Sequence, residues 1–287
     1  MKYSGRHFTL AELETIREWI ARDPKLNRAE LSRRFCRTFN WLKVNGGLKD
    51  MSCRVAMLRM QDDGLLQLPL ATRKAPCSKV VIKPTTLTAP QDEINNPVHQ
   101  LGELSLHRVK GRRQAALWNE YIDRYHYLGH KPLPGAQLRY FIKTNNKQVV
   151  ALIGFGAAAW KIAPRDNLIG WSPQQREKQL HLVVNNARFL ILPWIQSKNL
   201  ASKILGLVAR QLPSHWQEQY GYKPLLLETF VELQRFTGTC YKAANWFCVG
   251  ETTGRGKCNR DKAATRVKKL IWLYPLDKSY KSKLCLD

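Results

Sequence analysis

One long stretch of the chain, residues 185–256, alternates short apolar runs with segments of helical spacing. The apolar runs have strand length and are rich in branched and aromatic residues, as buried strands are. In chain order the predicted elements are a strand at 188–194, a loop at 196–199, a helix from Leu200, a strand at 224–231, a short helix around Tyr241 and a strand at 247–249. This order predicts an α/β (α+β) fold with a mixed sheet.

The loop after the first of these strands would lie at a helix N-terminus. Free backbone N–H groups and the helix dipole favour an anion such as a phosphate at such a place. The candidate cofactor-binding residues of this loop are Gln196, Ser197, Lys198, Asn199 and Ala201. None of them is a glycine, although close approach of backbone to a pyrophosphate normally uses glycine.

The charge of the chain is the second major constraint. Its 287 residues include 47 Lys and Arg against 22 Asp and Glu, a formal net charge of +25. Charge of this size costs self-repulsion and is typical of proteins with a polyanionic partner, so we expect DNA, or else RNA. An anionic membrane is a weaker candidate, because no stretch approaches the ~20 apolar residues of a spanning helix. The alternative is that the charge only promotes solubility.

The seven cysteines are scattered and form no CxxC pair. Together with the lack of a signal peptide, this pattern predicts a protein of the reducing cytoplasm. Three of them, Cys240, Cys248 and Cys258, have no histidine nearby, and we predict no metal site there.

The first 70 residues predict a helix-turn-helix or winged-helix-like DNA-binding domain. Helix starts are marked by Thr9 with Glu12, by Asn27 with Glu30, and by Asp50. Residues 65–68 would form a wing strand. The third helix carries the candidate DNA contacts Lys49, Ser52, Arg54 and Arg59. The alternative is a small helical bundle that docks proteins.

Residues 71–100 contain four prolines among polar residues and predict a linker that either runs along a surface or joins two domains. The remaining residues, 101–287, would form the mixed-sheet domain. A helix at 114–125 precedes a hairpin of strands at 137–144 and 148–157. Gly154 and Gly156, late in the second strand, indicate a bulge or a close backbone approach.

Two histidines and a glutamate are candidate catalytic residues. His126 follows the helix at 114–125 and suits general acid or base chemistry; sharing a metal with His130 and simple packing are the alternatives. His181 lies in an apolar run beside polar residues, a clustering typical of a site. Glu228 falls within a buried strand, so its carboxylate is either a base of raised pKa or an ion-pair partner of Arg188.

A glycine-rich, basic segment follows the last predicted strand of this stretch. Its glycines and cations suit phosphate contacts, although P-loop spacing is lacking. The candidate nucleic-acid contacts of this segment are Arg255, Lys257 and Arg260.

The spacing of Tyr241-Lys242, Asn245-Trp246 and Val249-Gly250 resembles the GNAT superfamily of acyl-CoA-dependent acetyltransferases, and the run from Gly238 to Trp246 resembles its Mom-like branch of phage DNA-modification proteins. The resemblance implies a GNAT fold, acetyl-CoA as a cofactor, and Tyr241 as the acid that protonates the leaving thiolate. The glycine-rich turn of that family is replaced here by residues 196–202, so the resemblance supports the fold better than the cofactor.

Almost the whole chain resembles the DruA family of Druantia anti-phage defence systems. The segments that carry this resemblance are residues 48–54, 125–130, 180–190 and 238–256. Because these segments are long and in order, we identify the chain as a member of the family. Membership implies defence or mobile-element work on DNA, together with other proteins of the system, and implies no particular reaction.

Three functions remain open at this point. The first is a cytoplasmic DNA-binding defence protein. The second is an enzyme that modifies a nucleic acid, by acyl transfer or by hydrolysis, and the third is a mobile-element protein that binds DNA without catalysis. For the enzyme we expect one pocket that contains Glu228, Tyr241 and the loop at 196–201, with His126 or His181 at its rim.

Overall fold

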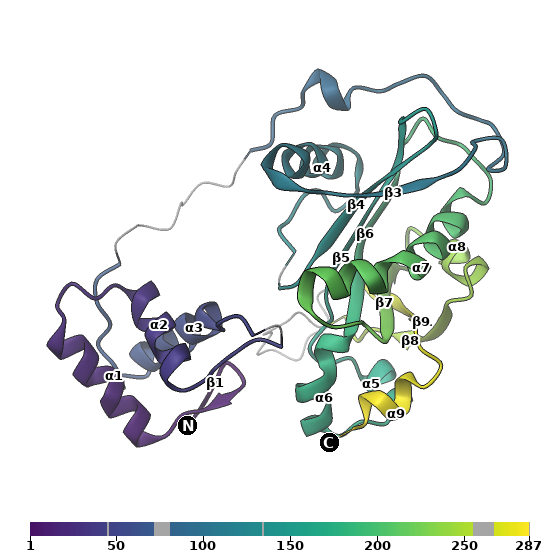
Figure 1. Ribbon diagram of the computed structural model, residues 1–287. Coiled ribbons are helices and arrows are strands. Elements are labelled where there is room, and N and C mark those ends of the chain that lie inside the picture. The colour runs from purple at the N-terminus through teal and green to yellow at the C-terminus, as the bar shows by residue number, and fades with distance from the viewer. Residues whose placement is uncertain (45, 72–80, 134, 255–266, 287) are drawn as a thin grey trace. The chain divides into compact units, whose positions relative to one another are not determined.

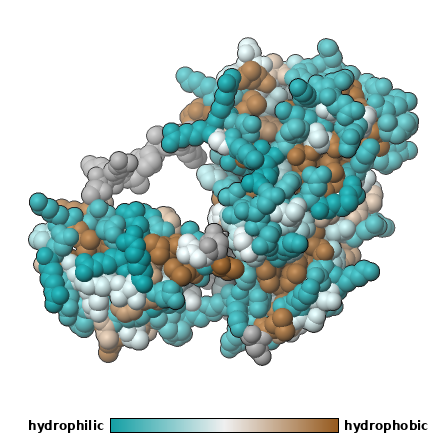
Figure 2. Space-filling model, viewed as in Figure 1, coloured by the Kyte–Doolittle hydropathy of each residue, from teal (hydrophilic) through white to brown (hydrophobic). Residues whose placement is uncertain are grey.

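The computed structural model describes residues 1–44, 46–71, 81–133, 135–254 and 267–286 (Figure 1). The chain forms two compact units, Met1–Val80 and Val81–Asp287, which are treated separately below. The face seen in Figure 2 is largely hydrophilic, with scattered apolar patches.

The first unit is a small helical domain. Its elements are β1 (Lys2–Tyr3), β2 (Arg6–His7), α1 (Leu10–Arg22), α2 (Arg28–Thr38) and α3 (Asp50–Asp62). Thr9 and Glu12 form the expected capping box of α1, and the Asn27 side chain accepts hydrogen bonds from the first turn of α2. The helices bury one apolar core, which includes Leu13, Ile16, Phe35 and Met60.

Three details of this unit differ from expectation. Asp50 is the first residue of α3 and not its cap, because its carboxylate bonds to Arg54 Nη2 at 2.8 Å instead of to the helix start. Residues 65–68 form no strand, since Leu66 and Leu68 pack into the helical core. The connection between α2 and α3, residues 39–49, is also longer than the three- to four-residue turn of a standard helix-turn-helix motif.

The second unit is built on a seven-stranded mixed sheet, which confirms the predicted α/β fold class (Figure 1). The strand order is β3-β4-β5-β6-β7-β9-β8, and every neighbouring pair is antiparallel except β6 and β7. The strands are β3 (Ser105–Arg108), β4 (Leu138–Lys143), β5 (Val149–Ala157), β6 (Val183–Ile191), β7 (Leu226–Glu232), β8 (Phe247–Glu251) and β9 (Lys269–Pro275).

Helices cover both faces of this sheet. The helices are α4 (Gly111–Tyr125), α5 (Ala163–Ile169), α6 (Pro173–Gln179), α7 (Leu200–Tyr220), α8 (Thr239–Ala243) and α9 (Tyr280–Leu284), with short 3₁₀ turns η1 (Thr86–Thr88) and η2 (Leu180–Leu182). Phe141 packs against Tyr121 of α4, whereas its neighbour Tyr140 stacks on His215 of α7. Because neighbouring residues of a strand point to opposite faces, α4 and α7 cover opposite faces of the sheet.

The segment before β3 belongs to the second unit and runs along its surface, one of the two alternatives for residues 71–100. Glu120 of α4 accepts hydrogen bonds from the backbone N–H and hydroxyl of Thr85 and from the Thr88 hydroxyl. Farther along, Ile94 pairs with Ile195: the Ile94 N–H donates to Trp194 O and the Gln196 N–H donates to Ile94 O, each at 2.8 Å. We call residues 85–96 the strap.

Candidate functional site

A cavity lies where the strands β6 and β7 diverge. The two strands pair in parallel from Val183 to Asn185 with Leu226 to Glu228, and beyond these residues each continues without the other. The cavity has a volume of about 630 Å³, within the ordinary range for ligand sites. It is lined by residues 125–128 after α4, by residues of β6, β7 and α8, by Ala201 at the start of α7, and by residues 235–238.

A bulge in β6 shapes one wall of the cavity. Gly154 of β5 pairs with Arg188 and the next residue, Phe155, pairs with Asn186, so Ala187 is the extra residue. Bulges often redirect side chains next to functional sites. A Cβ on Gly154 would lie 3.0 Å from the Trp118 ring, so the glycine is also needed for close packing of α4, as the sequence indicated.

Tyr241 lies in the cavity wall, at the end of a chain of buried polar groups. Its hydroxyl donates to Asn186 Oδ1 at 2.8 Å and lies 3.5 Å from the Thr229 hydroxyl. The Asn186 amide is held in turn, because its Nδ2 donates to the carbonyl oxygens of Gly154 and Arg188. Burial raises the pKa of the Tyr241 hydroxyl, so the hydroxyl keeps its proton at neutral pH.

His126 also lines the cavity and is buried. Burial, followed by the charges of Arg188 and Lys269, lowers the pKa of His126 to about 4. The ring is therefore neutral at physiological pH. Its Nδ1 accepts the Leu128 N–H at 3.2 Å, which leaves the ring proton on Nε2.

Glu228 does not line the cavity. It lies next to Thr229 in β7, and alternation along the strand sends its carboxylate to the other face of the sheet. There it is fully buried and bonds to Arg165 Nη1 and to the Ala159 N–H, both at 2.7 Å. Burial raises the pKa of the Glu228 carboxyl, and the Arg165 charge counteracts part of this effect.

The expected ion pair between Glu228 and Arg188 is therefore absent, because Arg165 of α5 occupies that position. Arg188 Nη1 bonds instead to the backbone oxygen of Ala187. Arg165 is 63 residues away along the chain, and no sequence pattern indicated it as the partner.

His181 also lies outside the cavity. It belongs to the turn η2, where its ring packs edge-on against Tyr222 and its Nδ1 bonds to Lys178 O at 2.9 Å. The expected single pocket thus contains Tyr241, His126 and Ala201, and lacks Glu228 and His181.

The loop before α7 does not fit a pyrophosphate group. Of its five candidate residues, Ala201 lines the cavity, and Gln196, Ser197, Lys198 and Asn199 do not. The Gln196 N–H is already bonded to Ile94 of the strap, and the loop has no glycine for close backbone approach. These contacts do not provide the pyrophosphate site that acetyl-CoA would need.

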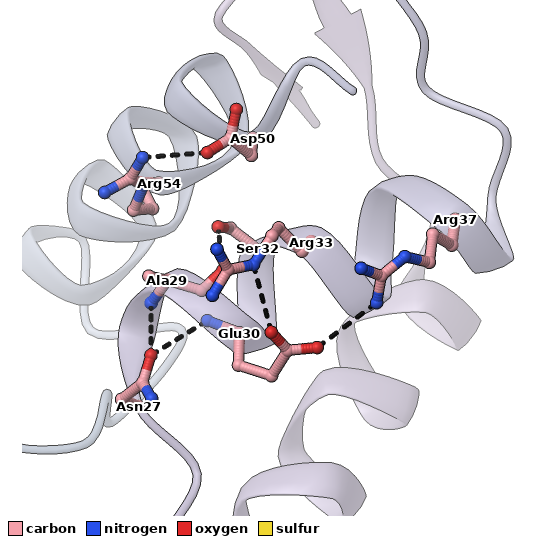
Figure 3. Close-up of polar contacts among 8 residues, drawn as sticks. All are labelled: Asn27, Ala29, Glu30, Ser32, Arg33, Arg37, Asp50 and Arg54. Carbon is pink, nitrogen blue, oxygen red and sulfur yellow. Dashed lines mark hydrogen bonds and ion pairs between the residues drawn. The ribbon is translucent and has the colours of Figure 1, made fainter. Parts of the chain in front are cut away.

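The candidate DNA contacts of α3 are only partly exposed. Arg59 is exposed, whereas Lys49, Ser52 and Arg54 are half-buried. Figure 3 shows Arg54 directed towards Asp50 on the same helix, and Arg33 and Arg37 of α2 directed towards Glu30. The exposed apolar side chains of α3 are Met51, Val55 and Leu58.

The other candidate contacts, Arg255, Lys257 and Arg260, lie outside the described residues. Among the residues that are described, no cluster of three or more His, Cys, Asp or Glu side chains could hold a metal ion. Within the same residues, no helix has both the length and the apolar character needed to cross a bilayer.

Two features of the site could not be predicted from the sequence. Thr229 is one, since nothing in a buried strand distinguishes a hydrogen-bonding threonine from a packed one. The other is Phe236, whose exposed ring lies beside that of Tyr127 at the cavity. The polar pair Asn185-Asn186 in a buried strand was a usable signal for the Tyr241 contact.

The strand order, the parallel pair β6–β7 and the cavity between its diverging ends define a mixed α/β body. Several solved acetyltransferases are similar in fold. Mutant forms of spermidine/spermine N-acetyltransferase SpeG from Vibrio cholerae share 10% identity at a TM-score of 0.40, over 63% of this chain and 99% of theirs. A putative phosphinothricin N-acetyltransferase shares 14% identity at a TM-score of 0.40, over 61% of this chain and 100% of its own.

The chain belongs to the DruA family of Druantia defence systems, because the family model for Druantia protein DruA matches residues 60–279, more than half of its length. This match confirms the family predicted from the sequence. No curated protein sequence matches the chain.

Proposed function

We propose that this protein is the DNA-binding component of its defence system. The observation that carries the proposal is the formal net charge of +25 on 287 residues. Because such charge is self-repulsive, it is typical of proteins that neutralise a polyanion. Membership of the DruA family supports the same conclusion, since a defence system must meet invading nucleic acid.

Salt dependence tests this proposal. Lysine and arginine contacts release counterions from DNA, so affinity for a labelled duplex should fall steeply, by about 10³-fold or more between 50 and 200 mM salt if six or more phosphates are contacted. Fluorescence anisotropy over a salt series measures the slope. A flat salt response, or a lack of binding at the lowest salt, would contradict the proposal.

The first unit is the proposed reader of duplex DNA, through α3. Arg59 is exposed there, and exposed Val55 and Leu58 suit contact with thymine methyl groups in a major groove. Arg59→Ala should therefore weaken duplex binding more than Arg22→Ala, which removes the same charge from an exposed site on α1. Equal losses would mean that the two arginines contribute only to the general charge.

A catalytic role on nucleic acid is the second candidate, and the polar groups of the cavity favour it. Tyr241 holds its proton and is fixed by Asn186, while neutral His126 carries its ring proton on Nε2 and can donate a hydrogen bond. Tyr241→Phe should then abolish protection in a phage-challenge assay with little loss of folded protein. Tyr280→Phe, at a buried tyrosine outside the cavity, is the matched control. Full protection by Tyr241→Phe would exclude a reaction that needs this hydroxyl.

A further inference from the structure

Two aromatic side chains are exposed side by side at the mouth of the cavity. Tyr127 follows α4 and is 39% exposed, and Phe236 follows β7 and is 52% exposed. Their ring centroids lie 5.6 Å apart with the planes tilted by 58°. Single exposed apolar residues are ordinary on protein surfaces, but a pair from distant parts of the chain at a cavity mouth is a feature to explain.

Planar groups extend this pair into a short stack. The Tyr127 ring stacks on the His126 ring, with centroids 4.9 Å apart and planes 21° apart. The Arg235 guanidinium lies 5.1 Å from the Tyr127 centroid. Since Tyr127 already has His126 and Arg235 as neighbours, the surfaces left for a further planar group are the exposed Phe236 ring and the guanidinium plane of Arg235.

The charges around the stack are mostly positive. The charges of Arg188 and Lys269 both lower the pKa of His126. The charges of Arg188 and Arg235 act in the same direction on the pKa of Tyr127. The described carboxylate that opposes them is Glu232, which bonds to Arg235 Nε at 3.3 Å. A ligand that suits this rim is planar, rich in π electrons and anionic, which is the chemistry of a nucleobase with its phosphate.

We propose that Phe236, Tyr127 and Arg235 form a stacking platform for the unpaired bases of single-stranded nucleic acid. The proposal rests on the proposed function, because it needs a nucleic-acid partner, and it adds the strand type and the contact residues. Bases of a duplex present only their edges in the grooves, whereas unpaired bases can stack on aromatic rings and arginine planes. The adjoining cavity of about 630 Å³ leaves room for a base beyond the platform.

Anisotropy with two single-stranded probes tests the platform. One probe is oligo-dT of roughly 12 nucleotides, within the usual site size, and the other is an abasic strand of the same length and charge. Phe236→Ala should weaken oligo-dT binding by about 5-fold to 150-fold, the usual range for loss of one stacked base, and leave abasic binding unchanged. Phe236→Trp should keep the parental affinity, which separates stacking from an effect on folding.

Trp160 offers a matched control. Its ring is also 52% exposed and has the guanidinium of Arg176 5.8 Å from its centroid, but it does not line the cavity. Trp160→Ala should leave binding of both probes unchanged.

The outcomes separate the two proposals. If the parent protein binds duplex DNA at low salt but neither single-stranded probe, the platform is wrong and the proposed function stands. If it binds neither the duplex nor the two probes, the proposed function fails and the platform with it. If the parent binds both probes and Phe236→Ala binds oligo-dT as the parent does, the platform alone is wrong. Equal losses for Phe236→Ala on the two probes would also overturn stacking, because the abasic strand has no base to stack.

Discussion

The two units of the protein use their polar side chains in different ways. Along the helices of the first unit, ion pairs join residues a few positions apart on exposed surfaces, such as Arg17 with Glu14 and Arg33 with Glu30. In the body, polar contacts join distant residues in the interior, such as Arg165 with Glu228 and Tyr241 with Asn186. Exposed pairs are worth little and exchange readily for other partners, whereas buried ones fix a geometry. The first unit is therefore suited to exchange its carboxylates for phosphates, and the body to hold a preformed site.

The largest effect should come from breaking the buried pair. Glu228→Ala removes the fully buried carboxylate that pairs with Arg165 Nη1 and leaves Asp166 as the remaining carboxylate partner of that arginine. The change should lower the free energy of unfolding by about 3 kcal/mol, the lower end of the range for a broken buried pair. Urea denaturation followed by tryptophan fluorescence measures this. Glu232→Ala, four residues along β7, removes a carboxylate whose partner, Arg235, is exposed to solvent and should cost less than about 1 kcal/mol. Parental stability of Glu228→Ala with loss of phage protection would restore Glu228 as a catalytic candidate.

Close packing in the body is the next target. Gly154→Ala places a methyl group 3.0 Å from Trp118 and should destabilise the protein by about 1–3 kcal/mol. The same exchange at Gly206, inside α7, meets only Arg210 at 3.8 Å and should stabilise the helix by about 0.5–1 kcal/mol. Thermal denaturation should show a lower Tm than the parent for Gly154→Ala and a higher Tm for Gly206→Ala. A stabilising Gly154→Ala would mean that α4 shifts easily over the sheet.

The lowered pKa of His126 should make the stability of the folded protein depend on pH. Its folded pKa of about 4 lies below the unfolded value of 6.5, so between these values the unfolded chain binds the proton and the folded protein does not. The contribution of His126 to stability is thus complete above pH 6.5 and is lost as the pH falls towards 4. His126→Asn should flatten this part of the profile when urea midpoints at about pH 5 and pH 7.5 are compared with the parent. Parallel profiles would contradict a neutral, buried ring.

The smallest effect is expected in the first unit. Glu30→Gln removes the carboxylate shared by Arg33 and Arg37 and should change stability by less than about 1 kcal/mol. At low salt it should strengthen duplex binding if α2 lies near the DNA, because two arginines lose their internal partner. Glu14→Gln on α1 is the control for net charge. Equal gains in affinity for the two variants would indicate a general charge effect.

Local patterns of the sequence predicted local structure well. The capping box of Thr9 and Glu12, the helix that begins at Leu200 and the hairpin of β4 and β5 depend on residues close together in the chain. The glycine at position 154 was also informative, since a bulge and a close helix contact both favour glycine in a strand.

Contacts between distant residues could not be predicted in this way. Glu228 was correctly expected to need a partner, but its partner lies on α5, a helix that the patterns did not reveal. Placing Glu228 in the same pocket as Tyr241 was wrong because strand alternation sends neighbouring side chains to opposite faces. The contacts of the strap could not be predicted either. Its prolines are typical of a linker, and the threonines that bond to Glu120 have no distinctive sequence pattern.

The strap also determines where the second unit can be separated from the first without losing its own contacts. The family match begins at residue 60, so it includes the strap and excludes most of the first unit. A body cut at Leu101 would lose the hydrogen bonds to Glu120 and Gln196, whereas a body cut before Val81 keeps them. The unit that can be transplanted therefore begins ahead of the strap, and a different N-terminal domain joined there would leave the body's interior intact.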